Sequence, residues 1–292
     1  MTELSTLGGN NSDAIDINEA GHVVGNAQVE NVIEHACLWV NGKAIDLGFK
    51  NANGINNNDQ IVGLDENLTA VKWVKNKTSR MGNGGRSEAI KINDLGQVVG
   101  TSGERSWNAT LWSGAVSEDL SPIQGKNSIA NSINNKGEIV GFSNLAEDKF
   151  RHATLWRKGV VTILNSSKDV ESEAYDINNN SEVVGSERKV NADGMGIESD
   201  YAVLWRDGKA MRLGTGVAFS INDKRQAVGY SGQFASIYIN GVATDLNTLI
   251  DPAEGWSLRI AKAINNSGSI VGSGYHNGHI RGYLLTPIIN VK

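Results

Sequence analysis

A single pattern with five fixed residues, Ala-x-x-Ile-Asn-x-x-x-x-x-Val-Gly, recurs seven times along this chain. Successive copies start 37 to 44 residues apart, and every copy keeps all five residues. Self-similarity at a period of about 20 to 50 residues is typical of solenoids, propellers and arrays. The repeat therefore constrains the fold more than any local signal. The copies run from Ala14 to Gly25, Ala52 to Gly63, Ala89 to Gly100, Ala130 to Gly141, Ala174 to Gly185, Ala218 to Gly229 and Ala261 to Gly272.

A second motif, close to Ala-x-Leu-Trp, follows each first one and ends at Trp39, Trp73, Trp112, Trp156 and Trp205 in the first five copies. It weakens to Tyr238 and Leu285 in the last two. Turn dipeptides such as Asn41-Gly42 follow this motif, and they accept the positive φ angles of hairpins. Since no segment shows helical periodicity, we predict an all-β chain with four short strands in each copy.

Four strands in about 40 residues, repeated, are typical of propeller blades. The seventh copy has little after Leu285 that resembles a fourth strand, whereas Leu4–Gly8 precedes the first copy and resembles one. We therefore predict one domain over residues 1–292, a seven-bladed β-propeller whose N-terminal strand completes the last blade. The alternative is an open β-solenoid, which would need distinct capping units at both ends.

The residues that every copy repeats favour structural roles. We expect the repeated Ala to allow close packing near the axis, and the Ile and Val to pack between blades. The Asn begins a hairpin turn and bonds to its backbone. The Gly indicates a bulge or a close backbone approach at the end of the second strand. The tryptophans of the second motif are expected to anchor the core.

Composition excludes several classes of function. Hydrophobic residues make up 39% of the chain and charged ones 20%, a globular balance, and the net charge of −5 gives no basis for nucleic-acid binding. No apolar run could span a bilayer, so we expect no membrane insertion. The N-terminus lacks a signal-peptide pattern, which fits a cytosolic protein or a mature domain. The lone Cys37 excludes an internal disulfide. We expect a monomer without cofactors.

The two motifs, followed by an Asp-Leu-Gly ending, resemble the HAF repeat family. The best copies are Ala14–Gly25 with His35–Trp39, and Ala130–Gly141 with His152–Trp156. The segment Asp245–Pro252 is similar to that family's closing repeat. The resemblance implies a bacterial, extracellular repeat protein, and it supplies no established catalytic residues.

Departures from the repeat are the candidate ligand sites, because a unique site needs asymmetry. The long loop 186–200 of the fifth copy contains Arg188, Asp193 and Asp200, and a second insertion spans 247–257. Trp107 and Trp256 are the tryptophans outside the repeated series, and both are predicted to lie in loops on the face formed by the loops between the second and third strands. Exposed aromatic residues there could anchor a partner or stack on a sugar, or fold back into a local core.

Tyr275, His276, His279 and Arg281 supply a base, an acid and a charge neutraliser within seven residues. Polysaccharide lyases of propeller shape use such groups, so this cluster is a candidate catalytic set at the channel mouth. The alternative is that these four residues lie in a polar surface loop, which accepts such residues freely, and have no catalytic role. No metal-ligand spacing is present. The leading hypothesis is a non-enzymatic module that binds a protein or glycan ligand through Trp107, Trp256, Arg188, Asp193, Asp200 and His276, and the alternative is a polysaccharide lyase.

Overall fold

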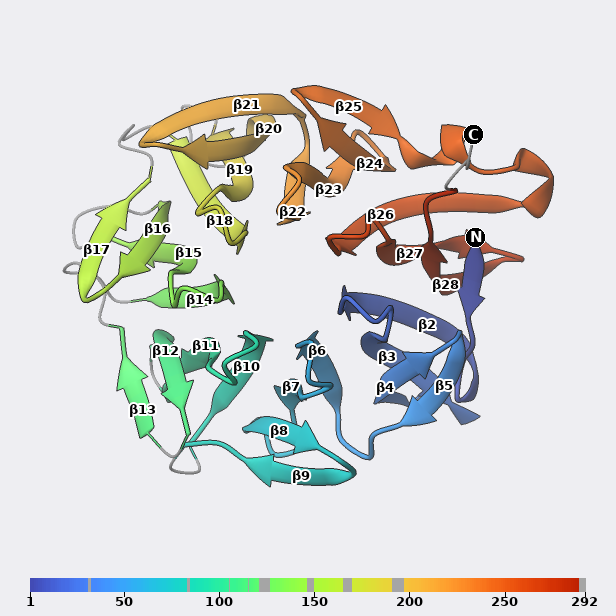
Figure 1. The fold of residues 1–292 in the computed structure, drawn as a ribbon, viewed down its shortest axis with the longest axis horizontal. Coiled ribbons are helices and arrows are strands. Elements are labelled where there is room, and N and C mark those ends of the chain that lie inside the picture. The colour runs from blue at the N-terminus through green and yellow to red at the C-terminus, as the bar shows by residue number, and fades with distance from the viewer. Residues whose placement is uncertain are drawn as a thin grey trace.

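The computed structural model describes residues 1–30, 33–82, 85–104, 106–114, 116–120, 127–145, 150–164, 170–190 and 197–288. Within these residues the chain forms seven four-stranded antiparallel sheets, set as blades around a central axis (Figure 1). The protein is a seven-bladed β-propeller, which confirms the prediction from the repeat.

In blades one to six, the four strands are consecutive in the chain and run in order from the axis outward. In the last blade, the outermost strand comes from the N-terminus instead. Blades one and two contain β2 (Gly8–Ile17), β3 (Val23–Val29), β4 (Glu34–Val40) and β5 (Lys43–Asp46), then β6 (Asn51–Ile55), β7 (Ile61–Leu64), β8 (Ala70–Val74) and β9 (Lys77–Arg80). Blades three and four contain β10 (Ser87–Ile92), β11 (Val98–Ser102), β12 (Asn108–Ser113) and β13 (Val116–Asp119), then β14 (Ser128–Ile133), β15 (Ile139–Asn144), β16 (Arg151–Arg157) and β17 (Val160–Ile163). Blades five and six contain β18 (Val170–Ile177), β19 (Val183–Val190), β20 (Ile197–Arg206) and β21 (Lys209–Thr215), then β22 (Val217–Ile221), β23 (Gln226–Ser231), β24 (Phe234–Ile239) and β25 (Val242–Asp245).

Blade seven joins the two ends of the chain. Its strand order is β26 (Trp256–Ile264), β27 (Ile270–His276), β28 (His279–Leu285) and β1 (Thr2–Leu4), with Leu4 paired to Gly282. The expected closure is confirmed, although the closing strand starts two residues before the predicted segment. Two 3-10 turns, η2 (Leu246–Leu249) and η3 (Pro252–Glu254), precede this blade.

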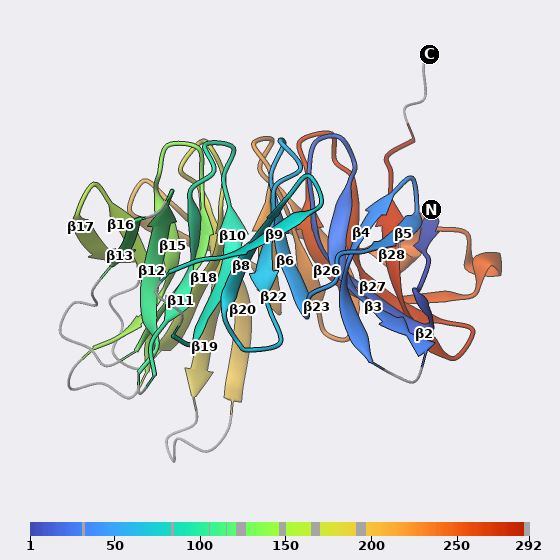
Figure 2. The same ribbon diagram turned by 90° about the horizontal axis from the view of Figure 1, so that it is seen from below.

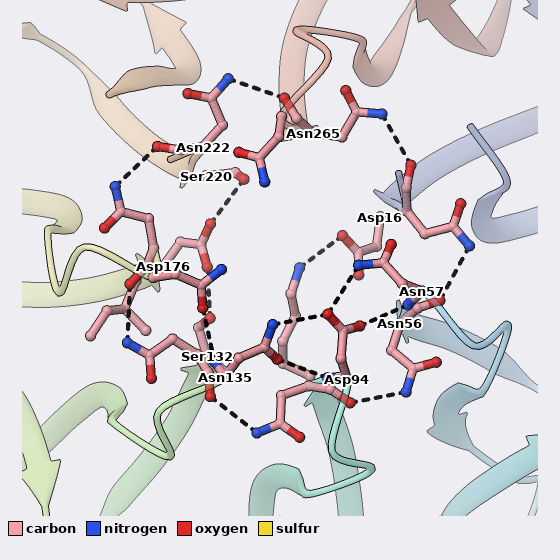
Figure 3. Close-up of a pocket in the computed structure, with 18 of the residues that line it drawn as sticks. Asp16, Asn56, Asn57, Asp94, Ser132, Asn135, Asp176, Ser220, Asn222 and Asn265 are labelled. Atoms are coloured by element: carbon pink, nitrogen blue, oxygen red, sulfur yellow. Dashed lines mark hydrogen bonds and ion pairs between the residues drawn. The ribbon is translucent and has the colours of Figure 1, made fainter. Parts of the chain in front are cut away.

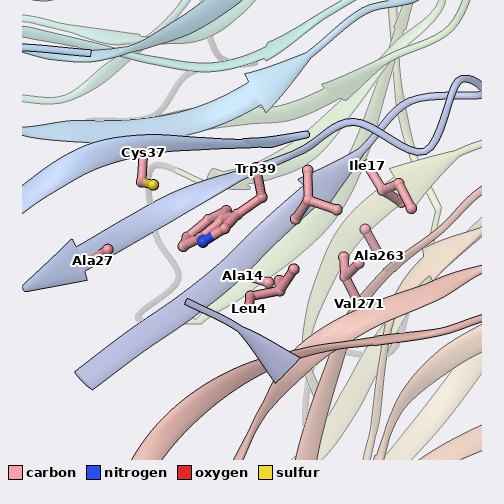
Figure 4. Close-up of a cluster of buried hydrophobic side chains, with 9 residues drawn as sticks. Leu4, Ala14, Ile17, Ala27, Cys37, Trp39, Ala263 and Val271 are labelled. Atoms are coloured by element: carbon pink, nitrogen blue, oxygen red, sulfur yellow. The ribbon is translucent and has the colours of Figure 1, made fainter. Parts of the chain in front are cut away.

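Closure buries apolar side chains between blades seven and one (Figure 4). Leu4 is fully buried in one cluster with Ala14, Ile17, Trp39 and Val271. Burying a leucine side chain stabilises a fold by about 2 kcal/mol. Equivalent clusters join neighbouring blades: the repeated Val24 of blade one packs with Ala52 and Ile55 of blade two.

The repeated glycine is required by a bulge in the first strand of each blade. In blade one the β2–β3 register shifts between Ala14 and Asp16, and Gly25 lies opposite Ala14. A Cβ on Gly25 would lie 2.0 Å from the backbone oxygen of Asp13. The same contact measures 1.8 to 2.0 Å at the six other repeated glycines. The close approach is confirmed, but it falls inside the second strand rather than at its end.

Four of the five repeated tryptophans are almost fully buried, as predicted, namely Trp39, Trp112, Trp156 and Trp205. Trp73 is partly exposed and packs at the edge of the cluster between blades one and two. Tyr238 replaces the tryptophan in blade six and is also buried.

The two faces of the ring differ (Figure 2). The turn face carries the tight turns between the first and second strands and between the third and fourth strands. The loop face carries the loops between the second and third strands and the connections between blades. At Asn41 and Gly42, φ is +51° and +75°, so this turn has the predicted left-handed backbone.

Candidate functional site

The central channel is lined by the first strand of every blade. Because of the repeated bulge, the residue directly after each repeated Ala lines the channel, and the next residue lines it in five of the seven blades. The residue nearer the loop face is Ile15, Asn53, Ile90, Asn131, Tyr175, Phe219 or Lys262. The next residue, nearer the turn face, is Asp16, Gly54, Lys91, Ser132, Asp176, Ser220 or Ala263.

The turn-face mouth is bounded by a closed ring of hydrogen bonds between the repeated asparagines (Figure 3). Each side-chain amide donates to the backbone oxygen of the Asn in the next blade, at 2.9 to 3.2 Å. The last bond runs from Asn265 of blade seven to Asn18 of blade one. Each Asn Oδ1 also accepts from its own turn, as between Asn18 and the His22 amide, so the predicted local role is confirmed.

A second set of hydrogen bonds lies inside the first ring in Figure 3 and uses the residue that follows each Asn. The backbone amide of Glu19 donates to Asn57 Oδ1, that of Asn57 to Asp94 Oδ1, and so on until the Asn266 amide reaches the Glu19 carboxylate. The cavity inside these rings has a volume of about 150 Å³. Its polar lining is largely engaged within the rings, which favours a structural role for this mouth.

Charged side chains meet deeper in the channel. Lys91 Nζ lies 2.7 Å from Asp16 Oδ1, and Asp176 accepts hydrogen bonds from the hydroxyls of Ser132 and Ser220. Burial disfavours the charge on Lys91, but the carboxylates of Asp16 and Asp176 outweigh it and hold the pKa of Lys91 above its usual value. One ammonium group thus lies between two carboxylates inside the molecule.

The loop-face mouth breaks the repeat. A cavity of about 250 Å³ opens there, lined by Ile15, Ile90 and Ile260 on one side and by Tyr175 and Phe219 on the other. The Tyr175 and Phe219 rings meet edge to face, with centroids 5.2 Å apart. Both side chains are half-buried. This mixture of apolar walls and a few polar groups is typical of ligand pockets.

Next to the aromatic side chains lie Arg188 and Asp200, two of the predicted ligand-binding residues. The Phe219 and Tyr230 ring centroids lie 5.8 Å apart, and the Tyr230 hydroxyl lies 3.5 Å from Asp200 Oδ2. Arg188 Nη2 lies 3.5 Å from the same oxygen. We call Tyr175, Phe219, Tyr230, Arg188 and Asp200 the mouth cluster.

The mouth cluster contains two polar atoms that are buried and unpaired. Arg188 Nε and Asp200 Oδ1 are buried and have no hydrogen-bond partner among the described residues. Burial raises the pKa of Asp200, although Arg188 opposes the shift. Burial alone would lower the pKa of Arg188, but the nearby carboxylates of Asp200 and Glu171 have the larger combined effect. The pKa of Arg188 therefore lies above its usual value. Buried polar atoms without a partner are uncommon in native structures, so this pair of charges departs from the fully bonded pattern of the turn-face mouth.

Arg188 and Asp200 lie on paired strands rather than in a loop, because β19 and β20 extend into the predicted insertion. Asp193 lies outside the described residues. Trp107 does lie in a loop, 38% exposed, with the Arg86 guanidinium 5.5 Å from its ring centroid. It is therefore a separate exposed aromatic residue on blade three.

Trp256 begins strand β26, so the prediction that it lies in a loop was wrong. Its ring stacks on His276, with centroids 4.6 Å apart and an interplanar angle of 4°. His276 Nδ1 lies 2.5 Å from Glu3 Oε2, and Arg281 Nε lies 3.1 Å from Glu3 Oε1. These contacts hold the closing strand β1 against blade seven.

The predicted catalytic set lies on the β27–β28 hairpin, where His276 pairs with His279. The cavities described at the two mouths of the channel are lined by other residues, so the expected location at the channel mouth was wrong. Tyr275 is half-exposed and faces Arg259 rather than a pocket. Among the described residues no group of three or more His, Cys, Asp or Glu side chains could hold a metal ion. No described helix is long and apolar enough to cross a bilayer.

Comparison with protein-family models found no match, and comparison with curated proteins found none either. Solved structures do match. The β-propeller domain of the Trilobed protease from Pyrococcus furiosus, described as having an open velcro topology, aligns with a TM-score of 0.57 at 12% identity over 80% of each chain. The WD40 propeller domain of Doa1 aligns with a TM-score of 0.52 at 12% identity, over 98% of this chain and 97% of that one. TolB from Acinetobacter baumannii aligns with a TM-score of 0.49 at 15% identity, and the match covers 70% of this chain and 55% of TolB. At these identities the similarity shows the fold alone.

Proposed function

We propose that this protein is a non-enzymatic binding module that takes a protein or glycan ligand on its loop face, at the mouth cluster. The observation that carries the proposal is the difference between the two channel mouths. The turn-face mouth repeats in all seven blades and is bonded within itself. The loop-face mouth has aromatic side chains in blades five and six only, beside an open cavity and two unmet polar atoms.

The chemistry of the mouth cluster suits either ligand class. Half-buried aromatic rings provide a rigid apolar surface with little entropy to lose. Arg188 and Asp200 supply a donor and an acceptor that would orient the ligand. The WD40 domain of Doa1 has a similar fold. The resemblance to HAF repeats, with the extracellular location that it implies, stays a prediction.

The test compares the purified protein with the double variant Tyr175→Ala, Phe219→Ala on a glycan array and in a peptide-display selection. Phe234→Ala is the matched control, because Phe234 is an exposed aromatic residue outside the channel mouth. We expect one ligand class to bind the wild type and the control, and to lose at least tenfold in affinity on the double variant. Thermal melts check that each variant folds.

Two results would contradict the proposal. One is a folded protein that binds nothing in either screen. The other is a ligand that binds the double variant as well as the wild type, which would move the site elsewhere; loss on Trp107→Ala would then assign it to blade three.

A further inference from the structure

The cavity at the loop-face mouth has apolar walls on opposite sides of the channel. All seven side chains that directly follow the repeated Ala line it, and every residue of its lining belongs to a described strand. Blades five and six lie across the ring from blades one to three (Figure 1). Tyr175 and Phe219 therefore face Ile15 and Ile90 across the opening, and all four side chains are half-buried. An entering group would lie between an aromatic wall and an aliphatic one.

The polar side chains of the lining are already bonded within the protein. Asn53 Nδ2 donates to the backbone oxygen of Ala89 in the next blade at 2.9 Å, and Asn131 makes the equivalent bond from blade four. Lys262 Nζ lies 2.6 Å from Asp13 Oδ2. The lining therefore offers an entering group few free hydrogen-bond donors.

The remaining polar groups follow the same pattern. The hydroxyl of Tyr175 hydrogen-bonds to Ser186, so this residue presents mainly its ring to the cavity. Lys91 and Asp176, at the base, are paired with the channel groups described above. A sugar has a hydroxyl on most of its carbons, and each hydroxyl that loses water without gaining a partner costs free energy. The lining thus favours an apolar group over a sugar.

The volume of the cavity, about 250 Å³, limits the size of its occupant. Sites for small molecules usually have volumes of about 300–1,000 Å³ and bury most of the surface of their ligand. This cavity is smaller and open to solvent, so it suits one side chain of a larger partner. An apolar pocket within a polar rim is the usual setting of an anchor residue in a protein interface.

The rim carries a carboxylate that no cation neutralises. Glu88 is half-buried next to Asn53, which donates a 3.0 Å hydrogen bond to its Oε1. Glu88 has no ion pair with any described residue, whereas Asp13 and Glu173, one residue before the repeated Ala of their own blades, are paired with Lys262 and Arg151. A basic residue of a partner would supply the missing charge.

We propose that this cavity receives one aliphatic or aromatic side chain of a partner protein, and that a lysine or arginine next to this anchor pairs with Glu88. The inference rests on the proposed function, because it concerns the same site, and it selects a protein over a glycan. The anchor packs between Ile90 and the rings of Tyr175 and Phe219. Contacts around the anchor exclude water from the cavity.

NMR titration of protein labelled with ¹³C at the isoleucine δ1 methyl groups tests the chemistry of the cavity. The probes are N-acetyl-leucinamide and N-acetyl-phenylalaninamide, compared with methyl α-glucoside and methyl α-mannoside. We expect the Ile15 and Ile90 resonances to move with the two amides at millimolar concentration and to stay in place with the glycosides. The resonance of Ile45, which is exposed on the outer strand β5, should not move with any probe.

The double variant Ile15→Asn, Ile90→Asn makes one wall of the cavity polar. It should keep the fold, because Asn53 and Asn131 occupy the equivalent positions of blades two and four. We expect it to weaken binding of the amides by at least about fivefold. Binding of a sugar should not fall, since the variant adds hydrogen-bonding groups. Val160→Asn, at an exposed position of β17, is the matched control.

A phage-display selection with random peptides tests whether a protein supplies the anchor. We expect the bound peptides to share one large apolar residue beside a lysine or arginine, and to lose binding when the apolar residue is replaced by alanine. Their affinity should fall as salt rises. Glu88→Gln should weaken binding about threefold and reduce this salt dependence. Glu118→Gln, on the exposed strand β13, is the control.

The possible failures separate the inference from the proposed function. The inference alone is overturned if the glycosides move the isoleucine resonances, if the bound peptides do not need an apolar residue, or if the amides bind and no peptide does. It is also overturned if light scattering shows a dimer that Ile15→Asn, Ile90→Asn dissociates, because a second copy of the chain would then occupy the cavity. Both fall if no probe moves the resonances and every ligand found binds Tyr175→Ala, Phe219→Ala as it binds the wild type.

Discussion

The side-chain amide of Asn265, in the last blade, donates a 3.0 Å hydrogen bond to the backbone oxygen of Asn18, in the first. The two residues are 247 positions apart in the sequence. This bond completes a ring in which every blade is both donor and acceptor, so the two ends of the repeat array are joined by the same interaction as its interior.

We expect Asn265→Asp to destabilise the fold by about 1–3 kcal/mol, because it removes the donor of this buried hydrogen bond and places a carboxylate against the backbone oxygen of Asn18. The carboxylate would still accept from the Ser269 amide, so the turn would keep its cap. Urea unfolding followed by tryptophan fluorescence measures the change. Asn277→Asp, at an exposed hairpin turn of the same blade, is the control. Equal stabilities of the two variants would contradict a structural role for the ring.

Gly141→Ala should destabilise the protein by on the order of 3 kcal/mol, since the added Cβ would lie 1.9 Å from the backbone oxygen of Ile129. Gly85→Ala is the matched change, because a Cβ on Gly85 meets nothing within 4 Å. It should alter the unfolding free energy by less than about 0.5 kcal/mol. Chemical denaturation of both variants distinguishes the two effects, and a harmless Gly141→Ala would disprove the need for close approach at the bulge.

Lys91→Met should cost about 3 kcal/mol at pH 7, because it leaves Asp16 with an uncompensated buried charge. The folded-state pKa of Lys91 lies above its usual value, so the ion pair contributes fully at neutral pH. Its contribution falls as the pH rises from the unfolded-state pKa of a lysine through that folded-state pKa. The difference between wild type and variant should therefore be constant from about pH 7 to 9 and shrink at higher pH. Lys77→Met, at an exposed lysine, serves as the reference. A difference below about 1 kcal/mol at pH 7 would show that the channel charges are not coupled.

Cys37 should resist thiol reagents in the folded protein. It is fully buried, and burial raises the pKa of its thiol to about 12. The reactive thiolate is therefore scarce at neutral pH as well as shielded. Titration with Ellman's reagent should give no fast reaction in buffer and one thiol per chain in denaturant. Rapid labelling in buffer would mean that blade one opens readily.

The blade count and closure could be predicted from the sequence because both depend on residues that repeat. The inter-blade bonds of Asn18 and its counterparts were missed, since a local pattern reveals the acceptors within a turn but not a partner about 40 residues away. One signal was available. Asp also caps turns, yet no copy replaces Asn with Asp, which indicates that the amide donor is needed. A serine two residues before the repeated Ala, as in Ser12, was also overlooked; its hydroxyl accepts from the Gly282 amide of the preceding blade.

The candidate site was only partly predictable. Arg188 and Asp200 were selected because they depart from the repeat, and the structure brings them together. Tyr175 and Phe219 were missed because they occupy the variable position directly after the repeated Ala, and its exposure to the channel depends on a bulge that the pattern alone does not reveal. His276 was selected for its chemistry, whereas its contact with Glu3 depends on where the chain ends meet.

The ring of asparagines has an electrostatic consequence. Its seven amide-to-carbonyl bonds all run in the same sense around the axis, so their dipoles lie head to tail in a circle and largely cancel at the centre. A ring of polar groups thus surrounds the opening without giving it a strong potential. The potential there is left to formal charges, namely those of Glu19, Asp94 and Asp223 in the inner set of bonds and those of Asp16, Asp176 and Lys91 deeper in the channel.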